Sequence, residues 1–121
     1  MHIDFKGGIN IALKIPEDRY QATLAFYQDI LLLDVERLDI SHPQVLESHR
    51  VAFGPNILWL DCVKGIERSE VWMEIKTSDV RQATAYLQTN GIGTCDEIEE
   101  IPSDMHWIKD PAGTTFILKN G

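Results

Sequence analysis

The sequence repeats a pattern half a chain length apart, and this repeat constrains the fold more than any other feature. Gln82-Ala83-Thr84 repeats Gln21-Ala22-Thr23 in a chain of 121 residues. Asp79 and Asp18 precede the two segments at the same spacing, so each aspartate can cap a helix whose glutamine completes a capping box. An internal duplication restricts topology more tightly than local propensities do. The chain is therefore predicted to consist of two similarly folded halves.

A strand with alternating apolar residues precedes each expected helix. In residues 9–15 every second residue is isoleucine or leucine, and Pro16 ends the run. In the second half the apolar residues Val71, Met73 and Ile75 alternate with Trp72, Glu74 and Lys76. The first helix is expected to extend to about Leu31, and the second to end at Asn90-Gly91.

Three short strands are expected after each helix. In the first half they are 35–40, 49–53 and 56–63, with an exposed loop over 41–48, and in the second half 94–101, 105–109 and 115–119. The acidic run 96–100 is expected to be a solvated edge strand, where like charges discourage association between sheets. The order βαβββ, used twice, predicts one α+β domain over residues 1–121, with module one at about 9–63 and module two at about 70–119.

Composition and charge restrict the partners that the chain can have. With 44% hydrophobic residues the chain can bury a core of ordinary size. Its net charge of -8 repels phosphate backbones and anionic lipids, so neither nucleic acid nor a membrane is an expected partner. The N-terminus lacks the pattern of a secretory signal, and the longest apolar run, 30–33, is too short to cross a bilayer. Cys62 and Cys95 lack the spacing of a disulfide framework or a metal motif, so a cytoplasmic location is expected.

Two further features accompany the duplication. A Phe26-Tyr27 pair lies late in the first helix, and an Asp110-Pro111-x-Gly113 turn enters the last strand. Over residues 9–119 the combination resembles the vicinal oxygen chelate superfamily, which includes glyoxalases, bleomycin-resistance proteins and extradiol dioxygenases. The resemblance implies that each half curls its sheet into a concave surface, and that the two form a cupped mixed sheet around a small ligand. It also implies a homodimer.

The resemblance further implies a metal site, with ligands at the start of the first strand and on the last strand of each half. In this sequence those positions are Asn10, Trp59, Trp72 and Ile117. Indole and alkyl groups do not bind divalent cations, and the amide of Asn10 would bind one only weakly. No metal cofactor is therefore expected. A shift of two residues would instead bring in Asp61, which shares a strand face with Trp59.

The strand faces that point away from the helices are expected to line the cup. They carry Asn10, Ala12 and Lys14 in the first half and Trp72, Glu74 and Lys76 in the second, joined by Trp59, Asp61, Thr115, Ile117 and Lys119. His106, beside Trp107, is expected near the same cup. Such a lining is largely apolar and aromatic, with a few convergent polar groups, as is typical of small-molecule sites. The predicted ligand-binding residues are Asn10, Trp59, Asp61, Trp72, Glu74, His106 and Ile117.

Two classes of function follow from this lining. Two indoles and the Glu74 carboxylate suit a flat or cationic ligand, which favours a binding protein similar to the drug-sequestering branch of the superfamily. The alternative is a metal-dependent lyase, isomerase or dioxygenase that uses Asp61, Glu74 and a histidine as atypical ligands. A metal-free isomerase with Glu74 as its base is a variant of this alternative.

Purely structural roles for the same residues stay open at this stage. Trp59 and Trp72 can simply fill the cup, because large aromatic side chains are more often part of a core than a ligand platform. Glu74 can pair with Lys14 or Lys76 rather than act as an acid or base. His49 and His106 can bind a metal together only if the fold brings them close.

Overall fold

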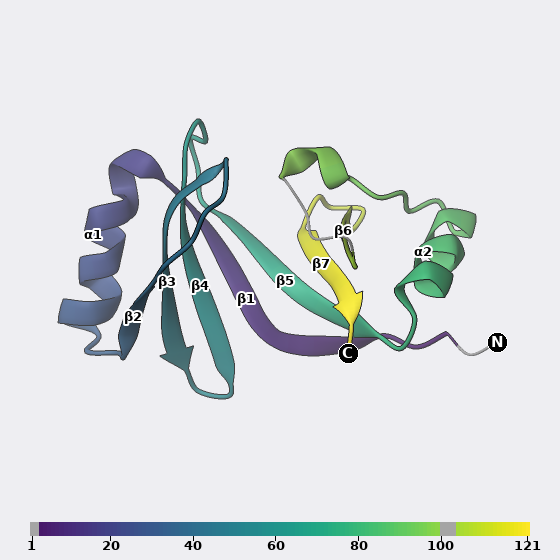
Figure 1. Ribbon diagram of the computed structural model, residues 1–121, viewed down its shortest axis with the longest axis horizontal. Helices are drawn as coiled ribbons and strands as arrows, with labels where there is room; N and C mark the ends of the chain where they lie inside the picture. Colours follow the sequence, from purple (N-terminus) through teal and green to yellow (C-terminus); the bar gives the residue numbers. More distant parts are fainter. Residues whose placement is uncertain (1–2, 100–103) are drawn as a thin grey trace. The chain divides into compact units, whose positions relative to one another are not determined.

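The computed structural model describes residues 3–99 and 104–121. It divides into two compact units. The N-terminal module is Ile9–Val71, and the C-terminal module is Trp72–Gly121 together with Met1–Gly8. The described residues contain seven strands and two α-helices, which makes the chain an α+β protein (Figure 1).

The N-terminal module contains β1 (Lys6–Pro16), whose first residues count with the other module, and β2 (Val35–Leu38), β3 (Val45–Phe53) and β4 (Asn56–Val63). The strand order is β2-β3-β4-β1, in which β1 and β4 are parallel and the other neighbours antiparallel. Between β1 and β2 the chain forms one continuous helical segment. It consists of the 3-10 turn η1 (Glu17–Arg19), α1 (Tyr20–Ala25) and the π-helical turn η2 (Phe26–Ile30).

The core of this module lies between the sheet and α1. Tyr20 and Leu24 are the buried residues of α1, and they pack against one face of the sheet. Ile11 and Leu13 of β1 face this core, as the alternation of the sequence predicts. Burial of Tyr20, Leu24 and the strand residues around them supplies the main stabilisation of the module.

The C-terminal module contains β5 (Glu70–Thr77), whose first two residues count with the other module, and α2 (Val80–Thr89). It also contains the 3-10 turn η3 (Asp96–Ile98), β6 (Met105–Lys109) and β7 (Thr115–Asn120). Its strand order is β5-β7-β6, with β5 and β7 parallel and β6 antiparallel to β7. Ala83 of α2 is fully buried and packs against Ile108 and Leu118 of the sheet. The face with Ile108 and Leu118 is therefore the helix-covered face.

The two predicted helix caps have different outcomes. Asp79 caps α2 as predicted, because its carboxylate accepts a hydrogen bond from the backbone N–H of Gln82 at 3.2 Å. Gly91, with φ 84°, follows the end of the helix. The cap predicted at Asp18 is wrong. Asp18 lies inside the 3-10 turn that continues directly into α1, and the residue before α1, Arg19, makes no side-chain capping hydrogen bond.

Two predicted segments of the strands and loops differ from the structure. The expected loop 41–48 is partly wrong, because β3 begins at Val45. The expected strand 94–101 is also wrong where the structure describes it: Thr94 makes an isolated bridge to Ile108, and η3 follows. The carboxylate of Asp96 accepts a hydrogen bond from the backbone N–H of Trp107 at 2.9 Å. At this position a side chain, rather than the backbone of a neighbouring strand, is the partner of β6. Residues 100 and 101 of the expected strand lie outside the described residues.

Candidate functional site

The parallel pairing of β1 and β4 positions the predicted residues of the N-terminal module. Ala12 is opposite Trp59, and Lys14 is opposite Asp61. Because side chains alternate along a strand, Asn10 and Lys14 share the face of Trp59 and Asp61, away from the core that packs on α1. Asn10, Trp59 and Asp61 therefore come together on one sheet face, as predicted from the alternation.

Trp59 and Asn10 are joined directly. The indole Nε1 of Trp59 donates a hydrogen bond to Oδ1 of Asn10 at 2.8 Å. An indole has a single polar group, which is a donor only, so this bond satisfies it. The amide oxygen of Asn10 is consequently engaged by a neighbouring strand.

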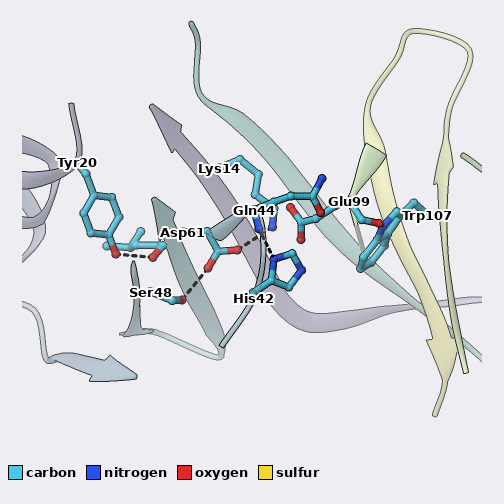
Figure 2. Close-up of polar contacts among 9 residues, drawn as sticks. Lys14, Tyr20, His42, Gln44, Ser48, Asp61, Glu99 and Trp107 are labelled. Atoms are coloured by element: carbon cyan, nitrogen blue, oxygen red, sulfur yellow. Dashed lines mark hydrogen bonds and ion pairs between the residues drawn. The ribbon is translucent and has the colours of Figure 1, made fainter. Parts of the chain in front are cut away.

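A buried ion pair lies on the same face. Nζ of Lys14 is 2.7 Å from Oδ2 of Asp61, with side-chain exposures of 6% and 14%. The hydroxyl of Ser48 donates to the other carboxylate oxygen of Asp61 at 2.7 Å (Figure 2). Ser48, on β3, was not among the predicted site residues. Its position opposite Asp61 depends on the register of β3 against β4, which the sequence does not specify.

In the C-terminal module the predicted residues of β5 and β7 also share one face. Ile117 of β7 pairs with Glu74 of β5 along one edge of the strand and with Trp107 of β6 along the other edge. The three side chains therefore lie in one row on the same face of the sheet. The rings of Trp72 and Trp107 lie 5.5 Å apart between centroids, with an interplanar angle of 54°. Nε1 of Trp107 donates to the backbone oxygen of Glu99 at 2.8 Å, which fixes the orientation of this indole. Trp107 was missed as a site residue, although alternation along β6 could have placed it opposite to His106.

Glu74 is the carboxylate of this face. Its Oε2 lies 3.7 Å from Nζ of Lys119, and its side chain is 3% exposed. Lys119 is thus a cationic neighbour of Glu74 that was not predicted from the sequence. The carboxylate packs against the backbone of Gly8, where a Cβ atom would overlap with Glu74. A glycine at position 8 therefore makes room for the buried carboxylate.

The structure does not bring His106 to the face of Glu74. His106 is opposite Leu118, on the helix-covered side of the sheet, because it is one residue from Trp107 in a strand. Its Nδ1 lies 2.8 Å from Oδ2 of Asp96. His106 is therefore part of the contact that anchors η3 to β6.

His49 lies in the core of the N-terminal module. Its Nδ1 is 2.8 Å from the Tyr20 hydroxyl, and that hydroxyl donates to the carbonyl oxygen of Leu60 at 2.6 Å. Since the hydroxyl has one proton, Nδ1 of His49 carries the hydrogen of the other bond, and Nε2 is the unprotonated nitrogen of the neutral ring. Burial lowers the pKa of His49, with Glu47 opposing and Arg37 adding to this shift. His49 and His106 thus belong to different modules and have separate partners.

No helix in the described part of the chain is both long and apolar enough to cross a membrane. No protein-family model and no curated protein matches the sequence.

Solved structures do match the fold. Methylmalonyl-CoA epimerase from Mycobacterium tuberculosis is 13% identical with a TM-score of 0.66, over 94% of this chain and 87% of that one. A hypothetical protein from Bacillus halodurans is 13% identical with a TM-score of 0.67, over 97% and 94%. A variant of Streptomyces coelicolor methylmalonyl-CoA epimerase, in complex with 2-nitronate-propionyl-CoA, is 12% identical with a TM-score of 0.60, over 98% and 100%.

The chain has the vicinal oxygen chelate fold. The metal-ligand positions expected for this fold can now be compared with the residues that occupy them. In the N-terminal module, Trp59 has no group that binds a cation, and the oxygen of Asn10 accepts the Trp59 hydrogen bond. In the C-terminal module, Trp72 and Ile117 offer an indole and an alkyl chain. These four residues do not fit a divalent cation.

Asp61, the alternative ligand for the vicinal oxygen chelate metal, does not fit either. Its two oxygens face the ammonium of Lys14 and the hydroxyl of Ser48, so a fixed positive charge already stands beside the carboxylate. Within residues 3–99 and 104–121, no three or more histidine, cysteine, aspartate or glutamate side chains form a group that could hold a metal ion.

Proposed function

We propose that the protein binds a small aromatic or cationic organic molecule on the sheet face of its C-terminal module. The observation that carries this proposal is the Trp72–Trp107 pair, 5.5 Å apart, on the same face as the Glu74 carboxylate. Indole rings attract flat ligands through stacking and cations through their negative faces. The hydrogen bond from Trp107 to Glu99 holds one ring in place, so little side-chain entropy is lost when a ligand binds.

Glu74 supplies the counter-charge for a cationic ligand. Lys119 is its present neighbour at 3.7 Å, and the Lys119 side chain is 29% exposed. A long lysine side chain can move its ammonium into water when a ligand cation takes its place. Because Glu74 is 3% exposed, the attraction between its carboxylate and a ligand cation is weakly screened. The net charge of -8 also favours the approach of cations.

Three probes of similar shape and different charge test this proposal by isothermal titration calorimetry. They are N-methylquinolinium, 2-naphthylmethanol and 2-naphthoate. We expect the cation to bind most tightly and the anion least. Trp72→Ala should weaken binding of the cation and the neutral probe by about tenfold or more, and Glu74→Gln should weaken only the cation.

Met73→Ala is the matched control, because Met73 is 37% exposed and points to the opposite face of β5. Equal affinities for the three probes, or binding that Trp72→Ala leaves unchanged, would contradict the proposal. A native mass spectrum of the untagged protein should be recorded first. It gives the mass of any retained ligand or metal, and it counts the subunits, for which we expect two.

A second candidate function is an isomerase in which Glu74 removes a proton from a carbon acid. The observation that favours it is a buried carboxylate 3.7 Å from a lysine ammonium on the neighbouring strand, an arrangement that can hold and return a proton. Two of the similar structures are methylmalonyl-CoA epimerases, so methylmalonyl-CoA is the first substrate to try.

Incorporation of deuterium from D2O into methylmalonyl-CoA, followed by NMR, tests this activity. Glu74→Gln should abolish the exchange, and exchange that persists in this variant excludes Glu74 as the base. A metal-dependent lyase, isomerase or dioxygenase is distinguished by its response to a chelator. Only that class loses turnover on chelation and regains it with a divalent cation.

A further inference from the structure

A pocket of about 330 Å³ lies within the N-terminal module, on the helix-covered side of its sheet. Its apolar part is formed by Leu13 and Ile15 of β1, of which Ile15 is 3% exposed. Tyr27 of η2 lines one side and packs on the module core. The volume is in the range that accommodates small organic ligands. None of these residues belongs to the sheet face proposed above as the binding site.

Two opposite charges stand at this pocket. Arg19 comes from η1, and Glu67 comes from the segment between β4 and β5. Both residues are exposed, whereas Leu13 and Ile15 are not, so the charges lie toward the mouth and the apolar residues toward the floor. In the described part of the chain, Arg19 and Glu67 form no ion pair with each other. Each can therefore engage a ligand group of opposite charge.

We infer that this pocket binds a small zwitterion with an apolar body, the chemistry of a free hydrophobic α-amino acid. Arg19 binds the carboxylate, Glu67 binds the ammonium, and the apolar body lies on Leu13 and Ile15. A guanidinium binds a carboxylate through two parallel hydrogen bonds, which gives the contact direction as well as strength. A zwitterion has no net charge, so the negative net charge of the protein does not repel it as it would a simple carboxylate.

Three probes with the same phenyl body test the inference on the full-length protein: L-phenylalanine, 3-phenylpropanoate and 2-phenylethylamine. Calorimetry should give an affinity for L-phenylalanine about tenfold or more above that of either single-charge probe. In a 1H–15N correlation spectrum, L-phenylalanine should shift the amide signals of residues 13–27 and 64–69. Shifts confined to other segments, or no binding at millimolar concentration, would overturn the inference.

Charge variants separate the two contacts. Arg19→Gln should lower the affinity for L-phenylalanine about tenfold and leave that for 2-phenylethylamine unchanged. Glu67→Gln should lower the affinity for L-phenylalanine and for 2-phenylethylamine, which both carry an ammonium, and leave the affinity for 3-phenylpropanoate unchanged. Arg68→Gln is the matched control, because Arg68 is an exposed neighbour that does not line the pocket. Equal losses for all three probes in Arg19→Gln would contradict a charge-specific contact. Because these variants keep Trp72 and Glu74, the outcome is independent of the function proposed above.

Discussion

Lys14 and Asp61 form an ion pair of 2.7 Å across two parallel strands, and both side chains are almost entirely removed from water. Each charge therefore compensates part of the solvation that the other has lost on burial. Ser48 adds a hydrogen bond to Asp61, so the carboxylate has a partner on both oxygens.

Removal of one partner should consequently be costly. We expect Asp61→Asn to lower the free energy of unfolding by about 3 kcal/mol, because the buried Lys14 ammonium loses the negative charge of Asp61. Replacing both residues, Lys14→Met with Asp61→Leu, should recover most of that loss. Urea unfolding measures these differences. The matched control is Glu36→Gln, which breaks the exposed Arg50–Glu36 pair and should cost less than about 1 kcal/mol. If Asp61→Asn and Glu36→Gln lowered the free energy of unfolding equally, burial of the Lys14–Asp61 pair would not be the cause of the loss.

The duplicated aspartates provide a second pair of variants. Asp79→Ala should destabilise the protein by about 1 kcal/mol, because it removes the acceptor for the Gln82 amide at the start of α2. Asp18→Ala should change stability by less than about 0.5 kcal/mol, since Asp18 lies inside η1 and caps neither helical segment. Thermal unfolding of both variants checks this expectation. A larger effect at Asp18 would be inconsistent with the structure.

Gly8 and Gly7 test the space around Glu74. Gly8→Ala should lower the free energy of unfolding by about 1–3 kcal/mol, because the added methyl group overlaps with the buried Glu74 side chain. In a Glu74→Ala background the same substitution should cost much less, which a double-mutant cycle measures. Gly7→Ala is the control, because no atom lies within 4 Å of a Cβ there. The explanation fails if Gly8→Ala costs the same with and without the Glu74 side chain.

Stability should depend on pH through His49. Its pKa in the folded protein is below the ordinary value of 6.5, mainly because of burial. Between these two pKa values the unfolded chain binds more protons than the folded one, so this contribution is complete above pH 6.5 and is lost as the pH falls. Urea midpoints measured from pH 8 to pH 5 should decline below about pH 6.5. His49→Gln should show a smaller decline over this range, and an unchanged slope would assign the effect to other groups.

Leu32 offers a stabilising substitution. It has a positive φ of 58°, which is unfavourable for a leucine, and its side chain is 80% exposed, so little packing compensates. Leu32→Gly should raise the free energy of unfolding by up to about 1 kcal/mol, since glycine adopts this conformation without strain. Differential scanning calorimetry should show a higher Tm. A lower Tm would mean that the leucine side chain makes a stabilising contact.

Much of the fold was predictable because the signals were periodic and repeated. Alternation identified β1 and β5 and their two faces, and the duplication supported the α+β fold. The errors arose where a local pattern had more than one outcome. Asp18 has the sequence of a cap, but the 3-10 turn after Pro16 includes it in the helical segment. Asp96 lies in a run that looks like an edge strand, but its carboxylate binds β6.

The candidate site was predictable only as far as strand faces determine it. The alternation of side chains along a strand placed Asn10 on the same face as Trp59, and Trp72 on the same face as Glu74. This assignment does not depend on the conformations of the side chains. The partners of these residues depend on register and rotamer. Register and rotamer place Lys119 of β7 beside Glu74, and they place Trp107 rather than His106 beside Trp72. A single strand position separates Trp107 from His106, so an error of one residue in the expected facing of β6 exchanges one for the other.

The three tryptophans are divided unequally between the modules: Trp59 lies in the N-terminal module, and Trp72 and Trp107 lie in the C-terminal module. Intrinsic fluorescence can therefore report on each half of the duplicated chain by itself. In Trp59→Phe all tryptophan emission comes from the C-terminal module, and in a Trp72→Phe, Trp107→Phe variant all of it comes from the N-terminal module. Coincident denaturation curves of these two variants would mean that the halves unfold as one cooperative unit, and separated curves would mean that each half has kept a folding transition of its own.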